Sequence, residues 1–114
     1  GGFMMNCQEI ETAVRMNVPI VVLVMRDDSY GLIKWKQDDR FGDHCFVDFT
    51  NPDFAKMAES MHAVGLRVDK TEDLKDVLEQ AFASGKVCII DCPVDYAENT
   101  KLTEHLKQMI AELE

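Results

Sequence analysis

The sequence predicts an α/β fold, a parallel sheet with flanking helices, and two observations support this prediction. Helical and strand-like patterns alternate along the chain of 114 residues, which is typical of parallel strands joined by helices. Residues 20–25 (IVVLVM) form a continuous apolar run, as expected for a strand buried on both faces of such a sheet. The length suits one domain, which we assign to residues 1–114.

The first helix is expected to begin at Asn6, which together with Glu9 resembles a capping box. Its apolar positions, spaced as on one face of a helix, are Ile10, Ala13, Val14 and Met16. Asn17 can end this helix, and Pro19 precedes the strand over residues 20–25. The segment therefore predicts a helix followed directly by the first strand.

A second helix is expected to begin near Ser29 and to include Trp35. Residues 36–50 are then expected to form a long loop, of a length that suits a segment covering a site or contacting a partner. Asn51 and Pro52 predict a helix start, with Asn at the N-cap and Pro at the first helical position. The apolar stripe of this third helix is Phe54, Ala55, Ala58 and Met61.

The second half of the chain continues the alternation. Residues 63–68 predict a short strand, and Thr71 is expected to cap the next helix. That helix has a complete apolar face, formed by Leu74, Val77, Leu78, Ala81 and Phe82, and Gly85 suits the position after its end. Residues 87–91 predict the third strand. A final amphipathic helix is expected to carry Leu102, Leu106, Met109 and Ile110 on one face.

Charge and cysteine content exclude several functions. The formal net charge is −9, so nucleic-acid binding is not expected, because phosphate contacts need a basic face. No apolar run approaches the roughly 20 residues that a membrane-spanning helix needs, so no membrane segment is expected. The cysteines Cys7, Cys45, Cys88 and Cys92 include no Cys-x-x-Cys pair. Zinc is therefore not expected, and we interpret them as buried free thiols of a reducing cytoplasm.

Ligands of open α/β sheets bind beyond the carboxyl ends of the strands, and the turn after residue 26 is such a place. Asp27 and Asp28 offer the hard oxygen ligands that Mg²⁺ prefers. The residues alone leave a second interpretation open, in which Asp28 or Ser29 simply caps the next helix. A further candidate is residues 91–96, at the end of the third strand.

The first residues are also a candidate site. Gly1 and Gly2 precede a helix start, where free N–H groups and the helix dipole favour a phosphate. A strand should precede a glycine turn of this kind. The chain is therefore expected to be a piece of a longer protein, cut inside a phosphate-binding loop.

Three stretches carry a resemblance to a known family: GGFMMN at residues 1–6, DDSYGLIKWKQ at residues 27–37 and IIDCPVDYAEN at residues 89–99. With them, the chain resembles the C-terminal cofactor-binding domain of the thiamine diphosphate-dependent enzymes, most closely that of acetolactate synthases. The likeness covers essentially the whole chain. The cofactor motif of the family begins Gly-Asp-Gly, and Gly1 matches its second glycine, so the domain is expected to be truncated at its N-terminus.

The resemblance implies how a cofactor would be held. Mg²⁺ would bind the Asp27 carboxylate and the Ser29 carbonyl, together with the motif aspartate that would lie before Gly1. Backbone N–H groups near the glycines and near the turn would complete the cradle of thiamine diphosphate, and a side chain at Gly1 or Gly2 would obstruct its approach. The implied cofactor-binding residues are Gly1, Gly2, Asp27, Ser29, Tyr30 and Gly31. Arg26 is a departure, because the family usually has Asn there.

The resemblance also implies a reaction. An enzyme of this kind decarboxylates pyruvate and condenses the product with a second 2-keto acid, as a transferase or lyase of branched-chain amino acid biosynthesis. In the family, the glutamate that activates the cofactor belongs to the pyrimidine-binding domain of a partner subunit. No catalytic residue is therefore assigned in this chain, and the chain alone is expected to be inactive. The resemblance implies a homodimeric or homotetrameric parent in the cytoplasm, or in an organellar matrix in a eukaryote, and leaves FAD open.

Other interpretations remain. Pyruvate oxidase, glyoxylate carboligase and keto-acid decarboxylase share the fold, and only overall likeness separates them from acetolactate synthase. A phospho-receiver or other regulatory module also places paired aspartates at a strand end. There the pair follows the first strand and a later strand ends in the phosphoacceptor, whereas here a helix comes first and no later aspartate fits. A third interpretation is a folded fragment of an enzyme that has no activity when isolated. It is compatible with the resemblance to thiamine diphosphate-dependent enzymes.

Overall fold

The computed structural model describes residues 1–96 and 109 of the chain. The elements in chain order are η1 (Phe3–Met5), α1 (Glu9–Arg15), β1 (Val21–Arg26), α2 (Gly31–Phe41), α3 (Phe54–Ser60), β2 (Val64–Arg67), η2 (Thr71–Asp73), α4 (Leu74–Ala83) and β3 (Cys88–Pro93), where η marks a short 3-10 helix. The last helix expected from the sequence lies outside the described residues, apart from Met109, which is helical. Within the described part, no helix is both long and apolar enough to cross a membrane.

The described strands form one parallel sheet in the order β1–β3–β2. Both outer strands pair with β3, so that Asp91 of β3 lies opposite Val24 of β1 and Arg67 of β2. The side chains of Ile89 and Ile90 in β3 are fully buried, because this strand has neighbours on both edges and helices on both faces. The α/β class and the parallel sheet predicted from the sequence are confirmed.

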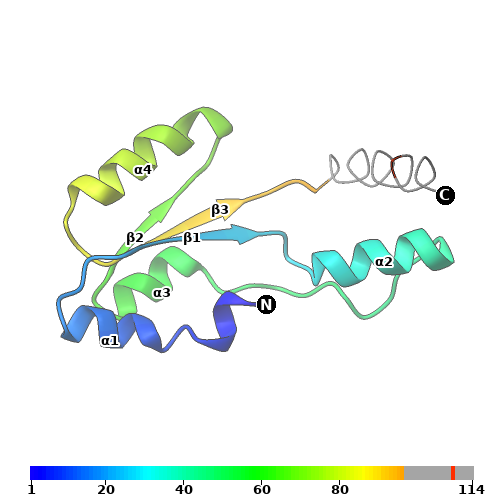
Figure 1. The fold of residues 1–114 in the computed structure, drawn as a ribbon, viewed down its shortest axis with the longest axis horizontal. Helices are drawn as coiled ribbons and strands as arrows, with labels where there is room; N and C mark the ends of the chain where they lie inside the picture. Colours follow the sequence, from blue (N-terminus) through cyan, green and yellow to red (C-terminus); the bar gives the residue numbers. More distant parts are fainter. Residues whose placement is uncertain (97–108, 110–114) are drawn as a thin grey trace.

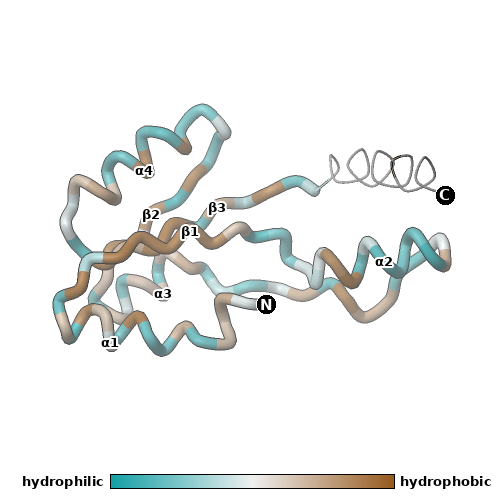
Figure 2. Tube along the Cα trace, in the orientation of Figure 1, coloured by the Kyte–Doolittle hydropathy of each residue, from teal (hydrophilic) through white to brown (hydrophobic). Residues whose placement is uncertain are grey.

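Helices α1 and α3 cover one face of the sheet and α4 covers the other, while α2 extends beyond the carboxyl ends of the strands (Figure 1). Two apolar clusters fill the layers. The cluster on the α1 and α3 side is Ile10, Ala13, Val24, Phe54, Ala58, Val87 and Ile89, and the cluster on the α4 side is Val68, Ala81, Cys88, Ile90 and Cys92. Figure 2 shows hydrophobic residues concentrated along the sheet and polar ones along most of α2.

The expectation that the first strand is buried on both faces is wrong. Val24 is buried, but Leu23 is 38% exposed and Met25 is 60% exposed. β1 is an edge strand of the described sheet, and α4 packs against β2 on the other edge. One face of β1 therefore packs on α1 and α3, while the outer part of its other face has no described helix over it.

Four helix boundaries differ from the sequence-based expectation. α1 begins at Glu9, because the short helix η1 comes first and the backbone carbonyl of Asn6, not its side chain, accepts from the Glu9 N–H at 3.1 Å. α2 continues to Phe41, through residues expected to form a loop, and ends at Gly42, whose φ of 74° is left-handed. Residues 36–40 (KQDDR) form a continuous polar run without an apolar stripe, so the hydrophobic pattern did not predict this part of the helix.

Asp53, not Asn51, is the N-cap of α3, and its carboxylate accepts a hydrogen bond from the Lys56 N–H at 3.1 Å. Thr71 begins the 3-10 turn η2 rather than capping α4 directly. Asn17 ends α1 with a φ of 53°, and Gly85 follows α4 with a φ of 61°, as expected.

All four cysteines are free, but only two fit the expectation of buried thiols. Cys88 and Cys92 are buried on the α4 face of β3, whereas Cys7 is half-buried and Cys45 is exposed. Burial in the apolar cluster, with a smaller contribution from the charge of Asp91, raises the pKa of the Cys92 thiol. The prediction of burial was wrong for Cys45 because this residue lies in the segment after α2 and not in the sheet.

Candidate functional site

The turn after β1 is held by backbone pairing with a distant segment. Asp28 takes up a left-handed φ of 54°, and its carbonyl accepts a hydrogen bond from the Phe49 N–H at 3.0 Å. The Tyr30 N–H donates to the Val47 carbonyl at 2.9 Å. Together these bonds form a bridge that sets Ser29 opposite residue 48, so the conformation of the turn depends on contacts on both sides of it.

The Asp27 carboxylate faces its own turn and the first turn of α2. Its Oδ1 accepts from the Ser29 N–H at 3.3 Å, and its Oδ2 accepts from the Ser29 hydroxyl at 3.4 Å. Ser29 is only 7% exposed. A Cβ on Gly31 would overlap Oδ2 of Asp27, so glycine at this position is what leaves room for the carboxylate.

Asp28 has side-chain partners different from those of Asp27. Its carboxylate accepts a hydrogen bond from the Asn51 side-chain amide at 2.9 Å and pairs with Arg26 Nη1 at 2.8 Å. The bond from Asn51, then the contact with Arg26, lowers the pKa of Asp28 below its ordinary value. Tyr30 is the N-cap of α2 and no side chain caps this helix. The alternative in which Asp28 or Ser29 serves only as a helix cap is therefore wrong.

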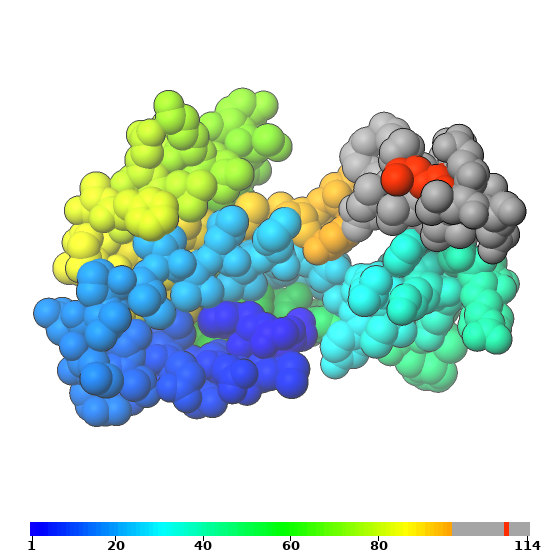
Figure 3. Space-filling model, in the orientation of Figure 1, coloured from blue at the N-terminus to red at the C-terminus, as the bar shows by residue number. Residues whose placement is uncertain are grey.

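The two glycines and Asp27 line the same hollow. Its volume is about 270 Å³, and its wall also includes Arg26 and Asn51. Figure 3 shows the N-terminal residues, in dark blue, beside this recess and next to the cyan start of α2. The carboxyl end of β1 and the N-terminal residues are distant in sequence but line one hollow. A binding site shared by the two segments requires this proximity.

A second hollow of about 340 Å³ adjoins the first and also includes Gly1 and Asn51. Tyr30 lines it, with its ring centroid 4.7 Å from that of Phe49. A Cβ on Gly1 would lie 3.2 Å from the Tyr30 ring, whereas a Cβ on Gly2 would meet no atom within 4 Å. Protein packing therefore constrains Gly1 and leaves the space beside Gly2 open.

Two expectations about backbone donors need correction. The Tyr30 N–H already donates to Val47, so it is not free to bind a diphosphate. Gly2 is the N-cap of the three-residue helix η1 rather than of a long helix. The first N–H groups of α2, beginning at Gly31, have no partner within the helix and are donors at this edge.

The residues fit a divalent cation as part of a larger ligand set. The Asp27 carboxylate and the Ser29 carbonyl are hard oxygen donors of the kind Mg²⁺ prefers. Among residues 1–96 and 109, no hydrogen bond is donated to the Ser29 carbonyl. The same residues contain no group of three or more His, Cys, Asp or Glu side chains able to hold a metal. A cation here would therefore need oxygen ligands from a bound diphosphate or from another segment.

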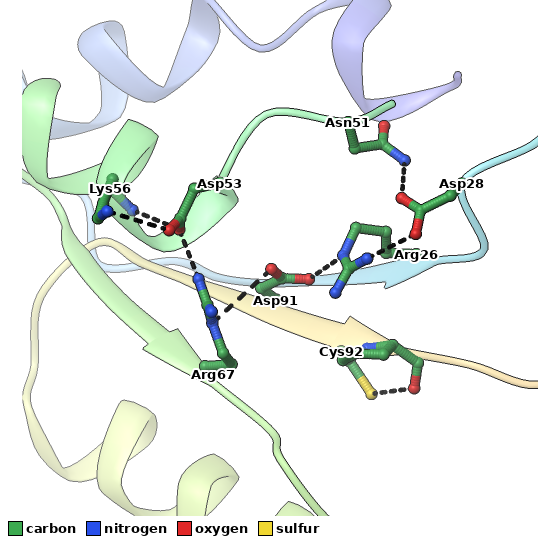
Figure 4. A network of polar contacts seen from close by, with 9 residues as sticks. Arg26, Asp28, Asn51, Asp53, Lys56, Arg67, Asp91 and Cys92 are labelled. Carbon is green, nitrogen blue, oxygen red and sulfur yellow. Dashed lines mark hydrogen bonds and ion pairs between the residues drawn. The ribbon is translucent and has the colours of Figure 1, made fainter. Parts of the chain in front are cut away.

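The structure reveals one polar network that the sequence did not predict (Figure 4). Asp91 of β3 is 2% exposed, and its Oδ1 pairs with Arg26 Nε at 2.8 Å. Arg67 Nε lies 4.0 Å from the other oxygen of Asp91, and Arg67 Nη2 pairs with Asp53 at 2.7 Å. The only signal in the sequence was that Arg26, Arg67 and Asp91 end or nearly end strands, which does not identify pairs.

Asn51 is the other residue whose role was missed. The sequence suggested an N-cap, but its side chain binds Asp28 and lines both hollows. Its neighbour Pro52 supported the N-cap interpretation, and only the return of residues 47–51 to the β1 turn shows the contact.

Comparisons with known proteins identify the family of this chain. The profile of the family described as "Thiamine pyrophosphate enzyme, C-terminal TPP binding domain" matches residues 1–92. An acetolactate synthase of Bacillus subtilis (strain 168) is 43% identical over 102 residues, which are 90% of this chain and 18% of that protein. A pyruvate oxidase of Lactiplantibacillus plantarum is 39% identical over 84 residues, which are 73% of this chain and 14% of that protein.

A solved structure shows the same fold. It is benzoylformate decarboxylase from Polynucleobacter necessarius, with a TM-score of 0.73 and 21% identity over 82% of this chain and 18% of that one. The chain thus spans less than a fifth of each of these three proteins. On the match over residues 1–92, this chain belongs to the family of C-terminal TPP-binding domains of thiamine pyrophosphate enzymes.

Proposed function

We propose that this chain is the part of an acetolactate synthase-like enzyme that binds thiamine diphosphate and Mg²⁺. The parent enzyme would decarboxylate pyruvate and condense the product with a second 2-keto acid. The observation that carries the proposal is the hollow in which Gly1, Gly2 and Asp27 meet at the carboxyl edge of the sheet. The 43% identity to an acetolactate synthase favours this reaction over others of the family.

The residues of this chain would bind and orient the diphosphate. The Asp27 carboxylate and the Ser29 carbonyl would hold Mg²⁺, which offsets the phosphate charge in a chain whose formal net charge is −9. The open space beside Gly2 would let a phosphate approach the backbone. The first N–H groups of α2 would complete the cradle, because the amino end of a helix favours anions.

Thiamine diphosphate, when bound, supplies the thiazolium carbon that breaks and forms the carbon–carbon bonds. The side chains of this chain would contribute position and charge rather than a proton donor or acceptor at the reacting carbon. We therefore propose that the pyrimidine-binding domain of a partner subunit supplies the activating glutamate, in a homodimer or homotetramer. The compartment would be the cytoplasm or an organellar matrix, and the proposal leaves a flavin requirement of the parent open.

The test replaces Asp27 in the full-length polypeptide that carries this chain. Asp27→Ala should weaken Mg²⁺ binding in the presence of thiamine diphosphate by about 10-fold or more, since it removes a direct ligand. Titration calorimetry measures this affinity, and acetolactate formation from pyruvate measures the activity. Asp76→Ala, which removes an exposed carboxylate on α4, is the matched control. Unchanged Mg²⁺ affinity in Asp27→Ala would show that Asp27 is not a ligand.

A pyruvate oxidase-like reaction is the second candidate, because a pyruvate oxidase is 39% identical over 73% of the chain. The two reactions differ in their products and in their need for an oxidant. With pyruvate as the sole organic substrate, acetolactate without oxygen consumption would support the first candidate. Oxygen consumption in step with pyruvate loss, without acetolactate, would support the second.

A further inference from the structure

We propose that Arg26 is a positioning residue for the metal ligand Asp27, and that it acts by tying the β1 turn to the buried carboxylate of Asp91. The proposal rests on the proposed function for the identity of the ion.

Asp91 is the buried carboxylate that holds the side chain of Arg26 in place. It lies on the central strand, opposite Val24 and Arg67, and is 2% exposed. A buried carboxylate needs a charged partner, because an unpaired charge in the interior is costly. The closest is Arg26 Nε, at 2.8 Å, while the nitrogen of Arg67 lies 4.0 Å from Asp91. The guanidinium of Arg26 is therefore fixed against the sheet.

The guanidinium of Arg26 contacts two carboxylates at the same time. While Nε binds Asp91, Nη1 of Arg26 binds Asp28 Oδ2 at 2.8 Å (Figure 4). A planar guanidinium can contact two carboxylates at once in a fixed geometry, whereas a lysine ammonium is a single point charge on a flexible stem. The two contacts of Arg26 connect the end of β1 to a side chain of the following turn.

The backbone of Asp28 links the contacts of Arg26 to the two proposed oxygen ligands. Its φ of 54° is uncommon for a residue with a side chain, and such a conformation persists where surrounding contacts hold it. Arg26 and Asn51 hold the side chain, and the Phe49 N–H holds the carbonyl. Asp27 and Ser29, which carry the two proposed oxygen ligands, are the residues on either side. Arg26 thus sets the relative direction of these donors.

The test compares two identical substitutions around the same carboxylate, in the full-length polypeptide. Arg26→Lys and Arg67→Lys both keep a positive charge near Asp91, but only the first removes a contact to Asp28. Arg26→Lys should weaken Mg²⁺ binding, titrated by calorimetry at saturating thiamine diphosphate, by about 10- to 100-fold, the usual cost of losing a residue that orients a metal ligand. Arg67→Lys should change this affinity less than about twofold, since the ion pairs of Arg67 are with Asp53 and Asp91 and not with the turn, within the described residues. Equal effects of the two variants, or none from Arg26→Lys, would overturn the proposal.

A second variant covers the case in which Arg26→Lys folds poorly. Asp28→Asn leaves the Arg26–Asp91 pair intact and should also weaken Mg²⁺ binding. Adding Arg26→Lys to Asp28→Asn should then cause no further loss, because both substitutions break the same link. Fully additive losses would show that Arg26 acts by another route.

A structural readout separates this proposal from the proposed function. Hydrogen–deuterium exchange at the amides of Tyr30 and Phe49, which pin the turn, should be faster in Arg26→Lys than in Arg67→Lys. If Asp27→Ala leaves Mg²⁺ affinity unchanged, the metal assignment fails, and the exchange rates alone then decide whether Arg26 positions the turn. Unchanged exchange in Arg26→Lys would reject that role.

Discussion

Gly31 and Asp27 share one space: a methyl group on Gly31 would overlap the Oδ2 atom of the Asp27 carboxylate. The requirement for glycine here is one of space rather than of backbone angle, because Gly31 begins a regular helix and its φ is not left-handed. The first residue of α2 and the residue after β1 therefore constrain each other, and the proposed metal ligand lies directly against the helix start.

Gly31→Ala should displace the Asp27 carboxylate and so weaken Mg²⁺ binding in the presence of thiamine diphosphate. The loss should be about 10-fold or more, as for other changes that misplace a metal ligand. Calorimetric titration of the full-length polypeptide measures it. Leu32→Ala, at the exposed neighbouring position, is the control. If Gly31→Ala left the Mg²⁺ affinity unchanged, the placement of the Asp27 carboxylate would not matter for Mg²⁺ binding, and the prediction would be contradicted.

Gly65→Ala should destabilise the fold, because a Cβ at residue 65 would collide with the backbone carbonyl of Ala55 where α3 crosses β2. Overpacking against backbone costs about 1–3 kcal/mol or more in the free energy of unfolding, which urea titration followed by circular dichroism measures. Gly2→Ala, with no atom within 4 Å of the new methyl group, should change this free energy by less than about 0.5 kcal/mol. Equal stability of both variants would contradict the close approach of α3 to β2.

Asp91→Ala should lower the free energy of unfolding by about 3 kcal/mol. The substitution removes the carboxylate that pairs with the half-buried guanidinium of Arg26. The side chain of Asp91 is 3% exposed and that of Arg26 is 23% exposed, so the value belongs at the lower end of the range for buried pairs. Urea unfolding of Asp91→Ala, Arg26→Gln and the double variant tests the coupling. Strictly additive losses would indicate that the two residues do not stabilise each other.

The pH dependence of stability should include a contribution from Asp53. The Lys56 N–H, then the ion pair with Arg67, lowers the pKa of Asp53 below its ordinary value of 3.8. A depressed pKa in the folded state stabilises the fold above the pKa of the unfolded chain, and this contribution is lost as the pH falls through the folded pKa. The unfolding free energies of wild type and Asp53→Asn should therefore differ at pH 7 and converge as the pH falls through the lowered pKa of folded Asp53. A constant difference across this range would contradict the assignment, and Asn keeps the ability to cap α3.

The thiols should react in an order set by exposure. Cys45 is exposed and Cys88 and Cys92 are buried, and burial also raises the pKa of Cys92, which lowers its thiolate fraction. At pH 7, a disulfide reagent should modify Cys45 first and the two β3 thiols only after unfolding. Peptide mass spectrometry locates the modified residues, and Cys45→Ser should remove the fast phase. Fast labelling of Cys88 in the folded protein would contradict the sheet assignment.

Local patterns in the sequence predicted the elements whose boundaries depend on neighbouring residues. The apolar run over residues 20–25 predicted β1, and the apolar face of residues 74–82 predicted α4, because these patterns record which side of an element faces the core. Asn17 and Gly85 predicted helix ends because left-handed backbone favours these residue types. Where the pattern was polar, as at the end of α2, the prediction was wrong.

The sequence by itself determined the α/β class, because hydrophobic periodicity is a local property, and its resemblance to a known family supplied the family and the candidate ligands Asp27 and Ser29. Only the tertiary structure decided that Gly1, Gly2 and Asp27 line one hollow, that Asp91 pairs with Arg26, and that β1 is exposed at Leu23 and Met25. These facts depend on strand order and on the return of residues 47–51 to the β1 turn. Contacts between residues separated by 23 to 65 positions leave no periodic trace in the chain, and so they appear only when it is folded.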